Sequence, residues 1–348
     1  MKEASFWRGL KGKELLCYLC YRLCKLKDGE IGYCHVRKNI GGKLYALNYG
    51  KAVAVNIDPI EKKPFYHFMP GTEAFSFSTV GCNFRCEFCQ NWEISQAFRG
   101  IIGEDLPPAR IREICKIQNI PGVAYTYTEP TIFMEYALDT AKLTMQDGKY
   151  NVFVTNGYMT TAAINEMSKY IDASRIDLKG FHDEVYKKLC GDVVLEYVLS
   201  SIKELHKRQH IEIINLIIPG WNDDEDDIRA SAKWVKELSP DIPMHFIAFY
   251  PANRMLTTPP TPLETLKRAR EIALEEGLHY VYTGNRQDEE TESTYCPKCK
   301  TKVIRRFGFA VLENKLDDDG RCPVCRYKLN VIMNIEKYKK EKKEKYGW

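Results

Sequence analysis

Eleven of the thirteen cysteines fall into three tight groups, and such spacing is typical of metal ligands. In a reducing compartment, thiols two or three residues apart are metal ligands more often than disulfide partners. The central group has three members and cannot pair internally, and Cys115 and Cys190 stand alone. The groups are Cys17/Cys20/Cys24/Cys34, Cys82/Cys86/Cys89 and Cys296/Cys299/Cys322/Cys325.

The central group supplies three thiolates from one short stretch, Cys82-Asn-Phe-Arg-Cys86-Glu-Phe-Cys89. Three thiolates can ligate three irons of a cubane [4Fe–4S] cluster and leave the fourth iron without a protein ligand. Such an open iron can chelate a small molecule. Phe88, just before the last cysteine, can pack against the base of that molecule.

The N-terminal group, Cys17-x2-Cys20-x3-Cys24-x9-Cys34, has enough thiolates to saturate either a tetrahedral zinc ion or a [4Fe–4S] cubane. Ligand type does not separate the two. The iron–sulfur chemistry expected of the central group favours an auxiliary cubane here, with zinc as the alternative.

The C-terminal group consists of two C-x2-C knuckles, Cys296/Cys299 and Cys322/Cys325, separated by 22 residues. This spacing predicts a single tetrahedral site with four sulfur ligands. A zinc ribbon is the default interpretation, and a rubredoxin-like iron is the alternative. Between the knuckles, Arg305, Arg306 and Phe307 either contact a partner or merely cover the metal site.

The composition is that of a folded protein and excludes a disordered or fibrous chain. Of its 348 residues, 44% are hydrophobic and 28% charged. No run approaches the ~18 apolar residues of a membrane helix, and Met1–Trp7 lacks the apolar stretch of a signal peptide. We therefore expect a cytoplasmic protein. Abundant lysine and only six glutamines resemble the composition of a thermophile.

The net charge of +4 is concentrated in the tail, Glu336–Trp348, which has six lysines and three glutamates. The rest of the chain is nearly neutral, which argues against a nucleic-acid-binding surface. A solvated helical end is the expected structure of the tail. The alternative is contact with an anionic membrane surface, which would place the protein peripherally on the membrane.

In the middle of the chain, short β-branched or aromatic runs alternate with longer amphipathic runs, a pattern that predicts βαβ units around a parallel sheet. Six or seven such units predict an open or closed β/α barrel, with chemistry at the carboxyl ends of its strands, and the central cysteines follow the first strand. The predicted regions are an N-terminal four-cysteine metal-binding segment (1–71), the barrel (72–288), a two-knuckle segment (289–335) and the Lys-rich tail (336–348). The predicted strands are Phe75–Val80, Gly122–Thr126, Asn151–Thr155, Ser174–Leu178, Ile211–Ile217, Met244–Phe249 and Leu278–Tyr282. The predicted helices are Arg110–Gln118, Ile132–Met145, Ala162–Lys169, Val194–Lys207, Asp226–Glu237 and Pro262–Glu275.

Three strings carry a resemblance to a known family: Asp58–Gly71 (DPIEKKPFYHFMPG), Gly81-Cys-Asn-Phe and Cys89-Gln-Asn-Trp92. With the cysteine trio they resemble the radical S-adenosylmethionine (SAM) superfamily, in its AmmeMemoRadiSam-system branch, which is similar to the activating enzymes of pyruvate formate-lyase. The resemblance covers nearly the whole chain. It implies a partial β/α barrel with small Cys-rich appendages at both ends.

The resemblance also implies an enzyme mechanism and its cofactors. A [4Fe–4S] cluster on Cys82, Cys86 and Cys89 would chelate the amino and carboxylate groups of SAM through its open iron. One electron then cleaves the sulfonium to methionine and a 5′-deoxyadenosyl radical, which removes hydrogen from a substrate. The protein's tasks are positioning, electron delivery from a donor such as ferredoxin or flavodoxin, and exclusion of water and oxygen.

Two polar residues after the second and third strands are expected to hold SAM. The superfamily usually has a Gly-Gly-Glu-like turn where this chain has Tyr127-Thr128-Glu129-Pro130, and Glu129 can still accept from the SAM ammonium. Its alternative role is at a helix start, with proline in the first position. Asn156 is expected to bond the ribose or the carboxylate, and its alternative role is in a cap or turn.

Three further SAM contacts are implied after later strands. Lys179, in an Asp-x-Lys match to the activating enzymes, would bind the SAM carboxylate, and its alternative is a rim ion pair with Asp177. Ile217 offers an apolar shelf for adenine, or is simply a buried strand end. His245 matches a carboxylate-contacting histidine of the activating enzymes, with a satisfied core histidine as the competing interpretation.

Three classes of function follow. In the first, the enzyme acts directly on an unactivated C–H bond, and its extra metal sites serve oxidation or C–C bond formation. Archaeal tetraether-lipid enzymes resemble this combination, so membrane-lipid hydrocarbon chains are a candidate substrate. The second is activation of a glycyl-radical protein, or another protein or peptide modification. Simple activators need no C-terminal knuckles. The third is a zinc-binding scaffold without catalysis.

Overall fold

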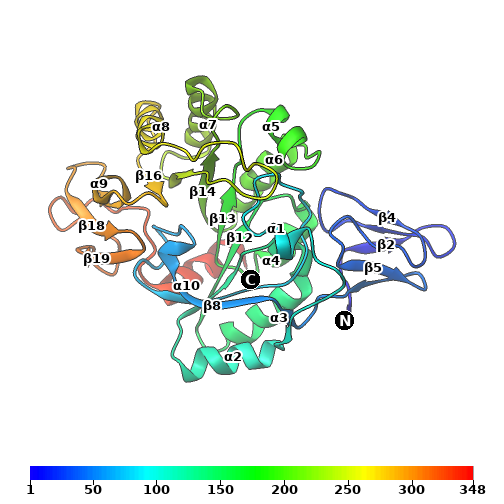
Figure 1. The fold of residues 1–348 in the computed structure, drawn as a ribbon. Coiled ribbons are helices and arrows are strands. Elements are labelled where there is room, and N and C mark those ends of the chain that lie inside the picture. The colour runs from blue at the N-terminus through cyan, green and yellow to red at the C-terminus, as the bar shows by residue number, and fades with distance from the viewer. Residues whose placement is uncertain (348) are drawn as a thin grey trace. The chain divides into compact units, whose positions relative to one another are not determined.

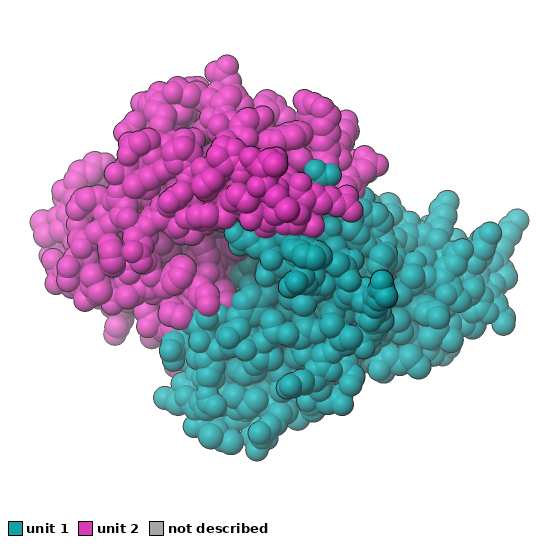
Figure 2. All heavy atoms as spheres, in the orientation of Figure 1, with its two compact units in different colours: residues 1–58, 73–174, 196–209 teal, residues 59–72, 175–195, 210–348 magenta. Residues whose placement is uncertain are grey.

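The computed structural model describes residues 1–347 and divides the chain into two compact units, coloured separately in Figure 2. Unit 1 comprises residues 1–58, 73–174 and 196–209. Unit 2 comprises residues 59–72 and 175–195, and the chain from residue 210 onward. The four regions expected from the sequence stay predictions.

Unit 1 is built on parallel strands whose side chains are almost all buried. Beside β8 (Ala54–Pro59), which has only one buried residue, these parallel strands are in order β9 (Glu73–Ser78), β11 (Gly122–Tyr125) and β12 (Tyr150–Thr155). Such continuous burial is typical of parallel strands covered on both faces. A Cβ at Gly122 would lie 1.9 Å from the ring of Tyr150, so this strand start requires glycine.

The helices of unit 1 have one buried face each. In α2 (Pro108–Ile117) the buried residues are Pro108, Ile111 and Cys115, which share one side of the helix. Cys115 is therefore a packing residue. Helix α3 (Met134–Met145) follows the 3-10 turn η2 (Pro130–Phe133) and packs on α2, β11 and β12. The other helices are α1 (Trp92–Ser95), α4 (Thr161–Met167) and α6 (Leu195–His206).

The N-terminal segment forms small antiparallel sheets, blue in Figure 1. Arg37 and Glu135 join this segment to α3 through a buried ion pair, with two N–H···O bonds of 2.8 and 2.9 Å. The strands, grouped by sheet, are β1 (Lys2–Glu3), β6 (Lys43–Ala46) and β5 (Arg37–Ile40); β2 (Trp7–Gly9), β3 (Leu15–Cys17) and β4 (Lys25–Leu26); and β7 (Lys51–Ala52) with β10 (Glu104–Asp105).

Unit 2 repeats the parallel arrangement with β14 (His210–Ile217), β15 (Met244–Ala248) and β16 (Val281–Gly284). Helix α8 (Leu263–Glu275) packs on β15 and β16 and on α7 (Glu225–Leu238), which lies beside it in Figure 1. The remaining elements here are η1 (Ile60–Lys62) and α5 (Asp183–Leu189). Strand β13 (Ala173–Asp177) contains the point at which the chain passes from one unit to the other.

The C-terminal part of unit 2 carries the knuckles on β17 (Thr294–Tyr295), β18 (Lys302–Phe307) and β19 (Ala310–Asn314), after α9 (Glu289–Glu292). Arg306 is fully buried and anchors this sheet, because it donates to the backbone oxygen of Tyr66 and the hydroxyl of Thr294, both at 2.7 Å. Arg306 therefore faces the 59–72 segment rather than a partner. Phe307 is 47% exposed.

The Lys-rich tail forms the expected helix, most of whose residues are exposed, and one side of it packs on the rest of unit 2. Helix α10 (Ile335–Tyr346) places the Tyr338 ring against Phe68, and the Tyr338 hydroxyl accepts from the backbone N–H of His210. Lys342 is buried. Across residues 1–347 no helix combines the length and apolar character needed to cross a membrane.

All seven predicted strands and six predicted helices are present, with ends shifted by a few residues. The largest shift is at β16, which begins at Val281 rather than Leu278. Leu278 instead closes α8: its N–H bonds to Ala273 O while Gly277, with positive φ, bonds to Leu274 O. This is a Schellman motif with an apolar residue after the glycine.

A network of buried polar groups surrounds Glu212, a residue of β14 in unit 2. Glu212, fully buried, accepts from the backbone N–H of Tyr66 and of His67, and from the imidazoles of His210 and His245. Burial favours the protonated form of Glu212, but these hydrogen bonds lower its pKa well below the usual range. The 59–72 segment is thereby fixed to the sheet.

His67 makes this network sensitive to acid. Its ring is fully buried, and burial lowers its pKa to about 3. The unfolded chain takes up a proton at this residue below about pH 6.5, whereas the folded chain does not until about pH 3. The contribution of the neutral, buried His67 ring to the free energy of unfolding is therefore complete above pH 6.5, and it is lost as the pH falls from 6.5 to 3. We expect the free energy of unfolding to fall by a few kcal/mol in this window.

Urea unfolding at a series of pH values measures this dependence, with His67→Gln as the matched variant. Gln keeps hydrogen-bonding groups but cannot titrate, so its curve is expected to be flatter between pH 6.5 and 3. Equal slopes for the two proteins would contradict the assignment.

Candidate functional site

The central cysteines occupy the loop between β9 and α1, after the carboxyl end of the first barrel strand. Cys86 is buried, and Cys82 and Cys89 are half-buried. The Cys82 sulfur accepts from the backbone N–H of Phe84 at 3.3 Å, and the Cys89 sulfur lies 3.3 Å from the Ser95 hydroxyl. These hydrogen bonds leave the sulfurs able to bind metal and hold the loop in shape.

Glu129 lies beside this loop and is 2% exposed. Its carboxylate accepts from the hydroxyls of Thr131 and Thr155, both at 2.6 Å, and from the backbone N–H of Thr131 and Asn156. Its charge contributes, after burial, to the raised pKa of Cys82. The helix-start role of Glu129 is therefore present, and its carboxylate also faces the cysteine loop.

Asn156 joins Glu129 at the same place. Its Nδ2 donates to Asn83 Oδ1 at 2.7 Å and lies 4.0 Å from the Cys82 sulfur, while its Oδ1 accepts from the backbone N–H of Tyr158. The bond to Tyr158 is the turn role expected as the alternative. Unit 1 thus brings together the trio, Glu129 and Asn156; Phe88, also on the loop, is buried.

Two loops of unit 1 are tied together by the motif residues around the trio. Asn91 Nδ2 donates to the backbone oxygen of Tyr127 at 2.7 Å, and the Thr128 hydroxyl donates to Thr79 O at 2.8 Å. The Tyr127 hydroxyl donates to Asp58 at 2.7 Å. The Cys-Gln-Asn-Trp string therefore positions the turn that carries Glu129.

Lys179 and Ile217 lie near each other in unit 2. Asn222 Nδ2 donates to Lys179 O and to Leu216 O, at 2.9 and 2.8 Å. Lys179 Nζ lies 3.0 Å from Asp177 Oδ2, the rim ion pair expected as the alternative, and Ile217 is the buried last residue of β14. Their SAM contacts stay predictions.

His245 lies at the second position of β15, near the amino end of the strand, and is 1% exposed. Its Nε2 is 2.8 Å from Glu212 Oε2. Burial lowers the pKa of His245 below its ordinary value, although Glu212 opposes this. The observed contacts are those of a satisfied core histidine, and the SAM contact stays a prediction.

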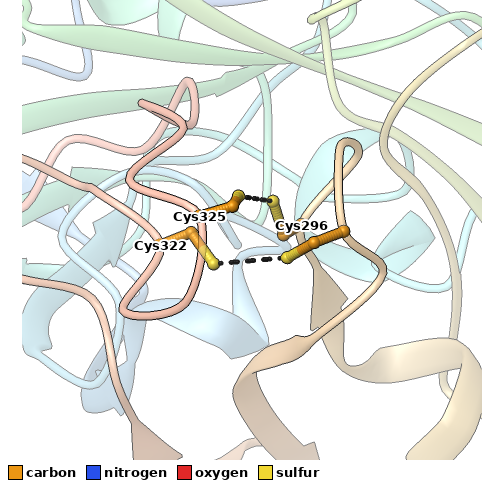
Figure 3. Close-up of side chains that lie close together, drawn as sticks. Cys296, Cys322 and Cys325 are labelled. Carbon is orange, nitrogen blue, oxygen red and sulfur yellow. Dashed lines mark hydrogen bonds between the residues drawn. The ribbon is translucent and has the colours of Figure 1, made fainter.

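The C-terminal cysteines form a compact four-sulfur site. The sulfurs of Cys296 and Cys325 are 3.5 Å apart, and those of Cys299 and Cys322 are 3.6 Å apart (Figure 3). All four lie within 4.8 Å of one another. A tetrahedral ion with bonds of about 2.3 Å has sulfur–sulfur edges of about 3.8 Å, so the geometry fits a single metal ion.

The two knuckles have the same local conformation. Lys300 and Arg326 both adopt positive φ, and their N–H groups bond to the backbone oxygens of Cys296 and Cys322. Burial raises the pKa of Cys296 to about 12, whereas the Thr301 hydroxyl and backbone N–H lower that of Cys299 to about 6. The charge of a bound metal ion would favour the thiolate of Cys296 against this effect of burial.

The N-terminal cysteines all line one cavity of unit 1. Cys24 is half-buried, and Cys17, Cys20 and Cys34 are buried. Burial raises the pKa of Cys34 to about 11 and raises that of Cys20 further, although the backbone N–H of Val36 and of Arg22 lower these values. A bound metal ion would favour the thiolate forms of Cys20 and Cys34 against this effect of burial.

The sequence comparisons identify the family. The profile of the radical SAM superfamily matches residues 76–232, which include the trio, Glu129 and Asn156. The chain is also 42% identical over 337 residues to an uncharacterized protein of Methanocaldococcus jannaschii, covering 96% of this chain and 100% of the relative. The chain belongs to the radical SAM superfamily. Membership implies a [4Fe–4S] cluster and SAM.

More distant relatives have a named activity or a solved structure. Pyruvate formate-lyase 1-activating enzyme of Escherichia coli K12 is 25% identical over 179 residues, 49% of this chain and 70% of the relative. A solved domain of a pyruvate-formate lyase-activating enzyme from Bacteroides vulgatus has TM-score 0.40 and 23% identity, over 47% of this chain and 99% of that one. The protein is a radical SAM enzyme related to glycyl-radical activating enzymes, and the expected fold class is confirmed.

Two functional positions of this radical SAM chain were not assigned from the sequence. Asn83 stands in the quoted Gly-Cys-Asn-Phe string, which signalled the family but not its role beside Cys82 and Asn156. Asn222 follows the Ile-Ile-Pro-Gly turn and fixes the Lys179 loop to the end of β14. An asparagine in a turn has a local role by default, so only the fold reveals these contacts.

Proposed function

We propose that Cys82, Cys86 and Cys89 hold the [4Fe–4S] cluster of this radical SAM enzyme. The observation that carries the proposal is a loop with three sulfurs, placed after β9 and beside the carboxylate of Glu129. The bound cluster supplies an open iron that binds SAM and one electron that cleaves its sulfonium. Phe88 packs against the adenine.

Around that cluster the chain's own residues bind and orient SAM. Glu129 is proposed to accept from the SAM ammonium, and Asn156 to bond the ribose or the carboxylate. Lys179, Ile217 and His245 are proposed as further contacts, to carboxylate, adenine and carboxylate respectively. The donors already bonded to Glu129 fix the direction of its carboxylate, which supports a positioning role as well.

The C-terminal site is proposed to bind one zinc ion, with a rubredoxin-like iron as the alternative. Four sulfurs within 4.8 Å, on two matching turns, support a single ion. Cys296 and Cys322 also belong to a buried cluster with Tyr66, Tyr280 and Tyr282. A structural ion at this place would hold the C-terminal sheet on the rest of unit 2.

We infer that the reaction removes a hydrogen atom from a C–H bond of a second substrate. The first candidate is an unactivated C–H bond with oxidation or C–C bond formation, of which membrane-lipid chains are one case. Tyr338 attaches α10 to the rest of unit 2, so the lysines of α10 are carried by an anchored helix. The second candidate is a glycyl-radical protein, favoured by the similarity to the E. coli activating enzyme.

Deuterium transfer separates these candidates. The reconstituted enzyme is incubated anaerobically with SAM and dithionite, and with either vesicles of perdeuterated lipid or a protein fraction labelled with deuterated glycine. Deuterium in 5′-deoxyadenosine, measured by mass spectrometry, identifies the substrate class. Unlabelled 5′-deoxyadenosine in both mixtures would overturn both candidates, and no 5′-deoxyadenosine at all would overturn the proposed SAM chemistry.

Replacing Glu129 tests its proposed contact with SAM. In Glu129→Gln the shape is kept but the charge is lost, so binding of the SAM ammonium is expected to weaken by about tenfold or more. The dissociation constant of SAM, measured by equilibrium dialysis of the reconstituted protein, is the readout. Thr131→Val removes one donor to Glu129 and is the control, expected to change the constant much less. Equal affinity of Glu129→Gln and the unaltered protein would contradict the contact.

A further inference from the structure

The shape of the N-terminal four-cysteine cavity points to a polynuclear cluster. All four cysteines line it, yet within residues 1–347 no three of their sulfurs lie within 4.8 Å of one another. A single tetrahedral ion needs edges of about 3.8 Å, as at the C-terminal site. In a cubane each thiolate binds a different iron, so its ligand sulfurs are farther apart.

Arg37 gives an independent sign of an anionic occupant. Its side chain lines the cavity, is 2% exposed, and bonds through its terminal nitrogens to Glu135 and Ser5. Its Nε is buried and has no acceptor in the part of the chain that the structure describes. A buried N–H without an acceptor is costly, and a thiolate or sulfide sulfur in the cavity would supply one.

One residue of the central-trio loop, Asn83, forms part of the wall of this cavity. Its backbone oxygen accepts from Arg22 Nε at 2.9 Å. Gly81 packs so closely that a Cβ there would lie 2.7 Å from Cys34 O. Asn83 Oδ1 is 3.9 Å from the Cys82 sulfur. Residues adjacent to the first central ligand therefore contact the N-terminal cysteine segment directly.

We propose that the N-terminal cysteines bind a [4Fe–4S] cluster that delivers the electron to the central site; this rests on the function proposed above. A donor protein gives up one electron and reduces the N-terminal cluster. The same electron would then pass to a cluster on Cys82, Cys86 and Cys89, which reoxidises the N-terminal cluster, and Asn83 lies between the two cysteine segments. The electron is consumed when the S–C5′ bond of SAM breaks to methionine and the 5′-deoxyadenosyl radical. No other reductant is needed.

The charge of the N-terminal segment indicates the kind of donor. Residues 1–58 contain eleven Lys and Arg and five Asp and Glu, whereas the other 290 residues contain 40 and 42. Lys25, the first residue of β4, and Lys27, just after that strand, are exposed and follow Cys24 and the 44% exposed Leu23. A basic face of this kind suits an acidic partner, so the donor is an acidic protein of the ferredoxin type.

The identity of the metal is tested without catalysis. A variant with Ala at Cys82, Cys86 and Cys89 is reconstituted anaerobically with iron and sulfide and reduced with titanium(III) citrate. We expect a cubane spectrum in electron paramagnetic resonance that does not change when SAM is added, because this cluster has no open iron. Zinc, or no iron beyond the C-terminal site, would overturn the proposal even if the unaltered enzyme cleaves SAM.

The path of the electron is tested by comparing two reductants. For Cys24→Ser, we expect SAM cleavage driven by reduced ferredoxin to fall by about tenfold or more, and cleavage driven by titanium(III) citrate, which can reduce the central cluster directly, to fall much less. The double variant Lys25→Glu/Lys27→Glu leaves the cysteines intact and is expected to raise the KM for ferredoxin. Lys340→Glu, on exposed α10, is the charge control and is expected to leave that KM unchanged.

These outcomes distinguish a failure of the proposed electron transfer from the N-terminal cluster from a failure of the proposed SAM cleavage. Unaltered ferredoxin-driven rates in Cys24→Ser and in the double variant would overturn the proposed electron transfer, while titanium-driven cleavage by the parent would still support the proposed function. If the parent yields no 5′-deoxyadenosine with either reductant, the proposed function itself fails.

Discussion

Replacing Cys86 with alanine is expected to abolish SAM cleavage while the barrel stays folded. Cys86 is 8% exposed on the loop after β9 and provides one of three thiolates for the proposed cluster. With only two, the cubane has no stable site, and 5′-deoxyadenosine formation should fall to the level of the cluster-free protein. The measurement is 5′-deoxyadenosine by liquid chromatography after anaerobic reconstitution and reduction, with circular dichroism as the check on folding.

Cys115→Ala is the matched control for the Cys86 variant. Cys115 is fully buried in α2 but belongs to none of the three cysteine groups. Its loss costs some packing and is expected to leave cluster content and cleavage intact. Undiminished cleavage by Cys86→Ala would contradict the assignment of the trio.

Removing a C-terminal thiolate is expected to have the largest effect on stability. In Cys325→Ala the four-sulfur site loses one ligand, and the buried cluster around Cys296 and Cys322 loses its cross-link. Metal affinity at such a site contributes directly to the free energy of folding, so we expect the free energy of unfolding to fall by several kcal/mol. Thermal melting and metal analysis are the measurements.

The same variant distinguishes zinc from redox iron. If the site binds zinc, the fraction of Cys325→Ala protein that stays folded should cleave SAM as fast as the unaltered protein, when both rates are divided by the content of the central cluster. With a rubredoxin-like iron in the electron path, the rate would fall in proportion to the lost iron even at temperatures where the protein is folded. Val324→Ala, next to Cys325 and 67% exposed, is the control and is expected to change neither property.

The barrel was predictable because its strands and helices differ in length and apolar pattern. The six- and eight-residue, almost fully buried runs of β12 and β14 and the one-sided buried face of α7 are signals of this kind. Helix α5 was not predicted because four of its seven residues are charged and it spans only two turns. Its buried face becomes visible only where the chain packs.

The site was predictable to the extent that ligand type and spacing determine it. Cysteine spacing predicted the compact C-terminal site, and the N-terminal cysteines line one cavity, but spacing did not show that the sulfur separations of these two groups differ. The trio as a cluster site stays a prediction. His245 shows a second limit. Similarity to a family motif predicts which strand carries the histidine but not its position along that strand. In the structure the His245 imidazole lies near the amino end of β15 and is hydrogen-bonded to Glu212.

Anomalous diffraction at the iron and zinc absorption edges, from an anaerobically grown crystal with SAM, tests the central claim most directly. We predict an iron cubane on Cys82, Cys86 and Cys89, with the amino and carboxylate groups of SAM on the fourth iron. A fourth protein side chain on that iron, or a loop without iron and sulfide, would contradict the account.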